Sequence, residues 1–204
     1  GDIMFDNTMF FAGLAEKKKA TFLDDLSLTR NSYILVTIHR DTNTDDIARL
    51  RELLLTLKTL AEEKDIKIVM PLHPRTLVSL KTRLNKLYSE LNQCKHILII
   101  PPVSYLEMIL LEKSCKMIMT DSGGVQKESH FFKKPCIVFR KETEWIELVN
   151  NGTAKLVDAD PARIRYEFFS FMDSHSDLDY PAFYGDGKTA EYILKEILLL
   201  FEKE

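Results

Sequence analysis

Short apolar runs alternate with amphipathic stretches along most of the chain, and this alternation restricts the possible folds more than any other feature. Continuously apolar runs are typical of strands buried on both faces of a sheet: Tyr33–Ile38, Ile66–Met70, Ile97–Ile100, Met117–Met119, Cys136–Phe139 and Ala154–Val157. The other stretches predict helices at Asp45–Lys64, Leu77–Leu91, Tyr105–Lys113, Val125–Phe132, Pro161–Met172 and Asp186–Glu204. This order predicts an α/β fold with a Rossmann-like, doubly wound parallel sheet.

The composition excludes several classes of protein. With 204 residues and 45% hydrophobic content, the chain can bury a core of its own. A net charge of −3 argues against a general nucleic-acid or membrane surface, and no apolar run reaches the roughly 18 residues of a membrane span. The N-terminus lacks the basic flank of a secretory signal, so a cytoplasmic location is expected. Cys94, Cys115 and Cys136 are odd in number and widely spaced, which favours free thiols over disulfides or a metal site.

A glycine turn joins the fourth predicted strand to the next helix, within the segment Thr120–Glu128. Gly123 and Gly124 at a helix N-terminus would let unpaired N–H groups approach an anion, and the helix dipole adds roughly half a positive charge there. Glu128 follows Gly124 by four residues on the same helical face, about 6 Å along the axis, which suits a sugar next to bound phosphates. The segment predicts a nucleoside diphosphate site. The alternative is an ordinary helix cap and tight turn.

Polar residues follow five consecutive strands at their carboxyl ends. In strand order they are His39 with Arg40, His73, the loop 101–105, the glycine turn and Arg140. In an open parallel sheet these positions share one edge, and ligands bind in the crevice outside that edge. Packing alone does not explain such a set.

Three of these candidates have a structural alternative. An isolated His39 would most simply cap its strand, but the arginine beside it and the facing glycine turn favour a functional role. His73 precedes a proline and is interpreted as a turn residue outside the site. Arg140 suits a diphosphate or carboxylate clamp, because a guanidinium binds oxyanions through two nitrogens. Its alternative is a surface pair with Glu142 or Glu144.

The order and spacing of several landmarks carry a family resemblance. They are 1–6, 36–40 with Asn43, His73-Pro74, 101–108, 120–128, Arg140 with Thr143-Glu144, and 184–187. The most specific element is Asp-Ser-Gly-Gly-x-Gln-x-Glu at 121–128. Together they resemble the C-terminal half of the non-hydrolysing UDP-N-acetylglucosamine 2-epimerases, over nearly the whole chain.

The resemblance implies a reaction and a role for each candidate. The family's reaction removes the C2 proton, eliminates UDP to give a glycal and adds UDP back with a proton delivered to the opposite face, without a redox cofactor or a metal. This chemistry needs hydrogen-bond donors that are held in place where negative charge develops on the leaving UDP. It also suits a histidine for proton transfer, because histidine titrates near neutrality. The implied residues are His39 as the active-site histidine, Ser122, Gly123 and Gly124 for the diphosphate, Glu128 for the ribose, Val103 and Met108 for the uracil, and Arg140 for the phosphates.

The resemblance also implies an arrangement of domains. The chain would be the UDP-binding half of a GT-B-like two-domain fold, with the catalytic carboxylates mainly in the N-terminal half. Residues 1–30 would form a connecting segment and helix, 31–173 the UDP-binding domain, and 174–204 a loop and helix that pack back toward the hinge. The expected partners are a UDP-sugar, the protein's own N-terminal domain and a second copy in a homodimer. Alone, the chain is expected to bind UDP weakly and to catalyse nothing.

Departures from the family pattern leave the substrate open. They are Asp41-Thr42 in place of a basic residue and a glutamate, Lys127 in place of a glutamate, and Trp145-Ile146 in place of Arg-Pro. The tryptophan form resembles the branch that acts on UDP-2,3-diacetamido uronic acids. Two alternatives from other classes are the donor domain of a GT-B glycosyltransferase and a UDP-sugar-binding module without catalysis.

Overall fold

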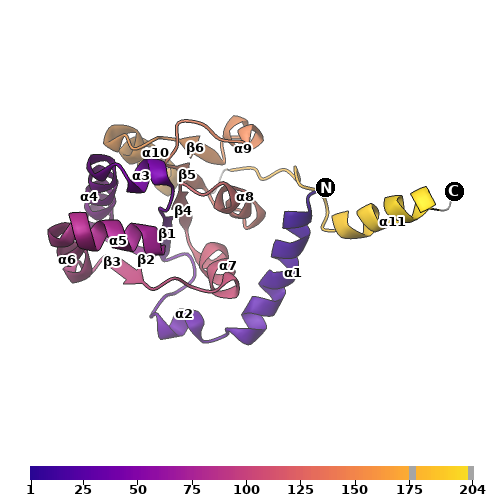
Figure 1. Cartoon of the computed structure of the whole chain (residues 1–204), viewed down its shortest axis with the longest axis horizontal. Helices are drawn as coiled ribbons and strands as arrows, with labels where there is room; N and C mark the ends of the chain where they lie inside the picture. The colour runs from indigo at the N-terminus through magenta and orange to yellow at the C-terminus, as the bar shows by residue number, and fades with distance from the viewer. Residues whose placement is uncertain (175–177, 202–204) are drawn as a thin grey trace.

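One sheet of six parallel strands forms the centre of the protein, in the computed structural model that describes residues 1–174 and 178–201 (Figure 1). The strands are β1 Tyr33–Thr37, β2 Lys67–Pro71, β3 Ile97–Ile100, β4 Met117–Thr120, β5 Cys136–Val138 and β6 Ala154–Leu156. Their spatial order is β3-β2-β1-β4-β5-β6, with Leu35 of β1 in register with Val69 of β2 and Ile118 of β4. The predicted fold class is confirmed, and each predicted strand is present to within one residue at either end.

Helices cover both faces of the sheet, which explains why the strands are apolar throughout. The helices are α1 Ile3–Lys18, α2 Phe22–Asp25, α3 Asp41–Thr44, α4 Ile47–Glu63, α5 Pro74–Arg83, α6 Asn85–Gln93, α7 Tyr105–Ser114, α8 Gly123–Phe131, α9 Ile146–Asn150, α10 Pro161–Ser174 and α11 Thr189–Phe201. Ile34 and Val36 of β1 belong to the core formed with α4, α5, α6 and α10, whereas Tyr33 and Leu35 belong to the core formed with α7, α8 and α9. Successive side chains of a strand point to opposite faces, so both faces need apolar residues.

The single helix predicted at Leu77–Leu91 is wrong, because the structure has two helices there. Helix α5 begins at Pro74, where a proline costs no hydrogen bond, and His73 caps it by accepting the N–H of Arg75 at Nδ1, 3.2 Å away. Leu84 leaves the helical region with φ −130° and ψ 36°, so α6 starts in a new direction. The assignment of His73 as a turn residue agrees with this cap. Its placement outside the site does not hold, because its ring lies 5.6 Å from that of His39, centroid to centroid, and both residues line one cavity.

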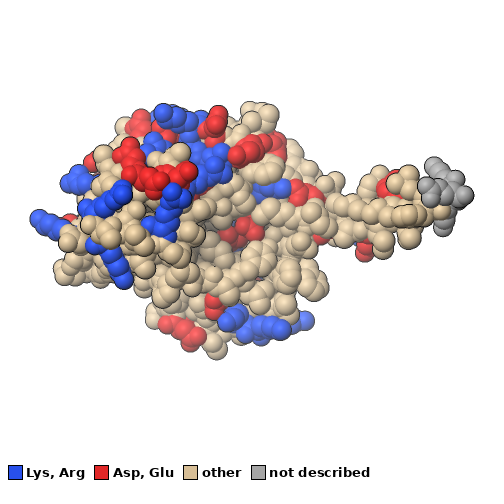
Figure 2. All heavy atoms as spheres, viewed as in Figure 1, with Lys and Arg blue, Asp and Glu red and all other residues tan. Residues whose placement is uncertain are grey.

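The two terminal helices behave differently. Ala12 and Ala15 of α1 pack against Ile109 and Leu110 of α7 in a small core of their own. Helix α11 projects from the body of the molecule (Figure 1), and most of the face of α11 seen in Figure 2 is uncharged. Its apolar side chains are exposed; Leu198, for example, is 53% exposed. Residues 175–177 and 202–204, which belong to the predicted segment 174–204, lie outside the described part of the chain.

Candidate functional site

The candidate site lies at the carboxyl ends of β1 and β4, the two central strands. From β1 the sheet continues to β2 and β3 on one side, and from β4 to β5 and β6 on the other. Strand order reverses between β1 and β4, and open α/β sheets bind ligands in the crevice at such a switch point. His39 and Arg40 follow β1 there, and the glycine turn follows β4.

A buried carboxylate, that of Asp121, ties these two strand ends together. It accepts the backbone N–H of His39 at 3.1 Å, the N–H of Arg40 at 3.0 Å and the side-chain amide of Asn43 at 2.9 Å. The imidazole Nδ1 of His39 lies 3.2 Å from the same carboxylate. Burial raises the pKa of Asp121, but the hydrogen bonds from His39 and Asn43 outweigh burial and hold this pKa below its usual range. Asp121 therefore stays ionised and fixes the orientation of His39.

The glycine turn caps α8 and leaves backbone donors free. Ser122 Oγ accepts the N–H of Val125 at 3.5 Å, and Thr120 Oγ1 accepts the N–H of Ser122 at 2.9 Å. The N–H groups of Gly123 and Gly124 have no acceptor among the described residues. Neither glycine has a positive φ, so backbone conformation does not require glycine here. What the missing side chains provide is space in front of the N-terminus of α8, as an anion-binding turn needs.

Glu128 lies one turn further along α8, only 6% exposed. The hydroxyl of Tyr105 donates to its Oε1 at 3.5 Å, and burial raises the pKa of its carboxyl group. The predicted loop residues Val103 and Met108 line a cavity of about 260 Å³ together with His39, His73 and Ser122. The structure thus brings His39 after β1, Ser122 after β4 and the loop after β3 to one cavity, whereas Gly123, Gly124 and Glu128 are not among the residues that line it.

Arg140 is paired differently from its predicted use. Its guanidinium makes two hydrogen bonds of 2.8 Å with the carboxylate of Glu144, and this partner lowers the pKa of Glu144 to about 2. The surface pair was one of the two alternatives. Contact with a diphosphate stays a prediction, and it would require Arg140 to share or leave Glu144.

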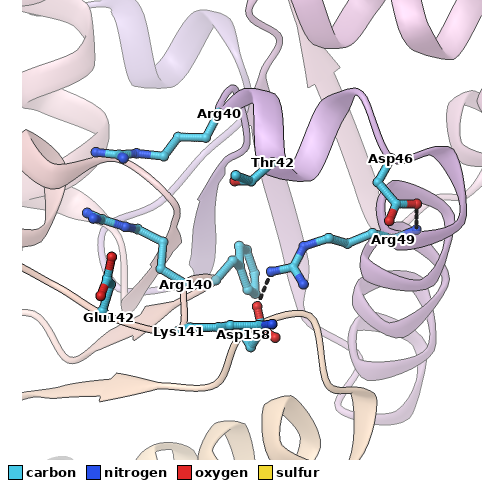
Figure 3. A pocket seen from close by; sticks show the side chains of 9 residues that line it. Arg40, Thr42, Asp46, Arg49, Arg140, Lys141, Glu142 and Asp158 are labelled. Carbon is cyan, nitrogen blue, oxygen red and sulfur yellow. Dashed lines mark hydrogen bonds and ion pairs between the residues drawn. The ribbon is translucent and has the colours of Figure 1, made fainter.

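A larger, basic cavity of about 570 Å³ adjoins the glycine turn. Arg40 and Arg140 point the same way on one side of it, whereas Arg49 is held by Asp158 (Figure 3). The Arg40 guanidinium has no hydrogen-bond or ion-pair partner within the described part of the chain. A Cβ atom on Gly123 would lie 3.8 Å from Arg40 Nη2. Arg40 is therefore a cation available to an anion at the turn.

Trp145 supports the glycine turn from the loop that follows β5, which sequence reasoning did not foresee. Its indole N–H donates to the carbonyl of Gly123 at 2.8 Å. The ammonium of Lys127, which also pairs with Asp2, lies 4.3 Å from the centroid of the Trp145 ring, a cation–π contact. Two of the departures from the family pattern thus touch each other beside the candidate anion site.

The part of the chain that the structure describes has neither a metal site nor a membrane-spanning helix. No group of three or more His, Cys, Asp or Glu side chains among residues 1–174 and 178–201 could hold a metal ion. None of the described helices is long and apolar enough to cross a membrane.

Comparison with known proteins gives a consistent set of relatives. A family profile described as UDP-N-acetylglucosamine 2-epimerase matches residues 1–198. A UDP-N-acetylglucosamine 2-epimerase homolog of Methanococcus maripaludis is 37% identical over 195 residues, which cover 96% of this chain and 52% of the relative. A UDP-2,3-diacetamido-2,3-dideoxy-D-glucuronate 2-epimerase of Pseudomonas aeruginosa is 41% identical over 159 residues, 78% of this chain and 41% of the relative.

A solved structure agrees with these sequences. The UDP-GlcNAc 2-epimerase of Methanocaldococcus jannaschii, in complex with UDP-GlcNAc and UDP, superposes with a TM-score of 0.85 at 33% identity. The match covers 98% of this chain and 54% of that one. The chain spans about half the length of the curated relatives it matches.

Proposed function

The chain belongs to the UDP-N-acetylglucosamine 2-epimerase family, and from this premise we propose that it is the UDP-binding half of an enzyme that epimerises a UDP-sugar at C2. The observation that carries the proposal is the Asp121 carboxylate, which fixes His39 at the strand end facing the free N–H groups of the glycine turn. A proton-transferring group thereby lies beside an anion site at the switch point of the sheet.

Each predicted site residue has a role in this proposal. Ser122, Gly123 and Gly124 hold the diphosphate, Glu128 the ribose, and the cavity at Val103 and Met108 the uracil, while Arg140 supports the phosphates and His39 transfers a proton. UDP leaves with additional negative charge, and fixed N–H groups at a helix N-terminus stabilise that charge without reorganising. His39 donates Nδ1–H to Asp121, which leaves Nε2 for the substrate.

The proposal includes a second domain in the manner of GT-B proteins. Residues 31–173 form the UDP-binding domain, and the exposed apolar side chains of α11 are the surface on which the second domain packs. Catalysis then needs carboxylates from that domain, so the 204-residue chain binds UDP but does not epimerise alone. A homodimer of the full-length protein belongs to the same proposal.

Titration calorimetry of the chain with UDP and UMP tests the binding claim. UDP should bind at least about tenfold better than UMP, because the glycine turn binds the second phosphate. Glu128→Ala should weaken UDP and UMP by a similar factor, because it removes only the ribose contact. Equal binding of UDP and UMP would contradict the diphosphate assignment.

A second candidate substrate is a UDP-2,3-diacetamido uronic acid. It is favoured by the 41% identical Pseudomonas aeruginosa relative and by the basic cavity, where Arg40 could accept the additional carboxylate. Turnover of the full-length enzyme with the uronic acid form and with UDP-N-acetylglucosamine distinguishes the two. Transfer of the sugar to an acceptor would instead indicate a glycosyltransferase, and binding without turnover a non-catalytic module.

A further inference from the structure

Helix α7 carries a buried acidic side chain in an otherwise apolar stretch. Glu112 is 0% exposed, between the buried Leu111 and Ser114. Neither of its carboxyl oxygens has a hydrogen-bond partner when the carboxyl group is taken as ionised, within the described part of the chain. An isolated carboxylate in such a place is strongly disfavoured, so Glu112 needs either a proton or a donor.

The carboxyl group of Glu128 is the neighbour that acts on Glu112, since after burial its charge and a hydrogen bond with it raise the pKa of Glu112. Helices α7 and α8 pack against each other at this point. Tyr105 and Glu112 are seven residues apart, about two helical turns, and therefore share a face of α7; Tyr105 also donates to Glu128 Oε1. A hydrogen bond between two carboxyl groups exists only when one of them is protonated, because an ionised carboxylate only accepts.

The surroundings of the two groups decide which one holds the proton. Burial, followed by the negative charge of Glu128, raises the pKa of Glu112 well above 4.5. Burial also raises the pKa of Glu128, but the hydrogen bond from Tyr105 and the charge of Lys127 act against burial there. The pKa of Glu112 is therefore raised more than that of Glu128, so a proton shared by the pair resides on Glu112.

We propose that Glu112 is a positioning residue that donates a hydrogen bond to the carboxylate of Glu128 and thereby orients it toward the ribose hydroxyls of the bound nucleotide. The inference rests on the proposed UDP-binding function. No proton is transferred when the nucleotide binds. Glu112 keeps its proton, and the ribose hydroxyls donate hydrogen bonds to the remaining lone pairs of the Glu128 carboxylate.

Of the titratable groups around the pair, His130 of α8 has its pKa lowered by burial from 6.5, and its Nε2 lies 2.8 Å from the carbonyl oxygen of Pro181. Burial raises the pKa values of Tyr33 on β1, Tyr105 on α7 and Cys115 after it, and that of Cys136 on β5 to about 12. The cation of α8 that faces Glu128 is Lys127, which pairs with Asp2. A pH dependence that disappears on substitution of Glu112 is thus assigned to the pair.

The test measures how strongly the chain prefers UDP over 2′,3′-dideoxyuridine diphosphate, because this ratio isolates the ribose contact. Calorimetry at pH 6.5 should give a preference of about tenfold or more for the wild type. Glu112→Gln should keep the preference, because its amide can donate in place of the acid. Glu112→Leu introduces a side chain of similar volume that cannot donate a hydrogen bond. This variant should lose most of the preference, because it should bind UDP several-fold more weakly while its affinity for the dideoxy compound stays the same.

The pH profile supplies a second readout that a merely structural role would not change. As the pH rises through the raised pKa of Glu112, two carboxylates face each other and the wild-type preference should fall. The profile is measured up to the highest pH at which the wild type stays folded; Glu112→Gln should keep its preference throughout, and the exposed control Glu90→Gln should follow the wild type. If the Leu variant does not fold, this comparison of the wild type with the Gln variant decides.

Two outcomes overturn the inference, and they are distinguishable. In the first, the wild type prefers UDP over the dideoxy compound, Glu112→Leu keeps that preference, and Glu112→Gln has the same pH profile as the wild type. This result would show that Glu112 does not position Glu128. If the wild type binds neither nucleotide, the proposed function fails and the inference fails with it.

Discussion

The imidazole Nδ1 of His39 lies 3.2 Å from a carboxylate oxygen of Asp121, and the same carboxylate accepts the backbone N–H groups of His39 and Arg40. One buried acid thus sets the direction of the histidine ring and joins the ends of β1 and β4. Because both effects depend on the ionised form of Asp121, its substitution should disturb stability and catalysis together.

Asp121→Asn should destabilise the fold by about 3 kcal/mol at pH 7, because an amide NH₂ would face donors that now meet a carboxylate. Urea denaturation measures this loss, and the exposed Asp41→Asn provides the matched control with a change below about 0.5 kcal/mol. A loss below about 1 kcal/mol for Asp121→Asn would contradict the assigned role of this carboxylate.

The wild type and Asp121→Asn should also differ in how their stability changes at low pH. The folded pKa of Asp121 is lower than its ordinary value of 3.8, so the ionised group stabilises the fold above about pH 4 and this contribution is lost as the pH falls through the folded pKa. The stability difference between wild type and Asp121→Asn should therefore shrink in acid. Denaturation at pH 7 and pH 3 measures it, and a constant difference would refute the explanation.

Gly123→Ala should separate binding from folding. The new Cβ would lie 3.6 Å from Glu144 Oε2 and 3.8 Å from Arg40 Nη2, both ordinary contacts, so the stability should change by less than about 0.5 kcal/mol. The methyl group would occupy the space in front of the free N–H groups, and UDP should bind at least about tenfold more weakly.

Gly13→Ala is the matched control for that substitution. Its Cβ meets nothing within 4 Å on the surface of α1, so it should stabilise the fold by about 0.5–1 kcal/mol and leave the UDP affinity unchanged. Equal UDP affinities for the wild type and Gly123→Ala would remove the glycine turn from the binding site.

Trp145→Phe should remove the hydrogen bond to the carbonyl of Gly123 and keep an aromatic ring beneath Lys127. The expected cost is about 1 kcal/mol of stability, with a UDP affinity reduced about threefold to tenfold because the turn loses its support. Thermal unfolding and calorimetry measure the two effects. A variant that loses stability but binds UDP normally would show that Trp145 only packs.

Helix α11 gives a prediction about the second domain. Leu198→Lys places a charge where the side chain is already 53% exposed, so the 204-residue chain should keep its stability within about 0.5 kcal/mol. In the full-length protein the same change should cost about 1–3 kcal/mol, because it would bury an unpaired charge. Equal, small effects in both proteins would mean that α11 does not cover an apolar surface.

The sequence predicted the sheet better than the helices and the pairing of side chains. Strand ends were predictable because a run such as Met117–Met119 is buried on both faces and shows its limits directly. The break at Leu84 was not, because no glycine or proline marks it. Asp121 acquires its partner Asn43 through a contact between elements far apart in sequence, and Glu112 acquires its partner through the packing of α7 against α8. Local patterns contain no information on such contacts.

The sequence also predicted which side chains form the candidate site better than it predicted how they pair. Residue type and position after a strand were enough to bring His39, Val103, Met108 and Ser122 to one cavity. They did not decide between the two possible partners of Arg140, because a guanidinium binds a carboxylate as readily as a phosphate. Only the fold shows that Glu144 lies within 2.8 Å.

Hydrogen exchange at C2 of the substrate tests directly whether this protein is part of an enzyme that epimerises a UDP-sugar. The full-length enzyme is incubated with UDP-N-acetylglucosamine, or the corresponding diacetamido uronic acid, in D₂O, and proton NMR follows C2. Deuterium should appear at C2 together with the 2-epimer, and His39→Ala should lose about 10²-fold or more of this rate while it still binds UDP. Epimerisation by His39→Ala at the wild-type rate, or no exchange at C2 with any UDP-sugar that binds, would refute the proposed function.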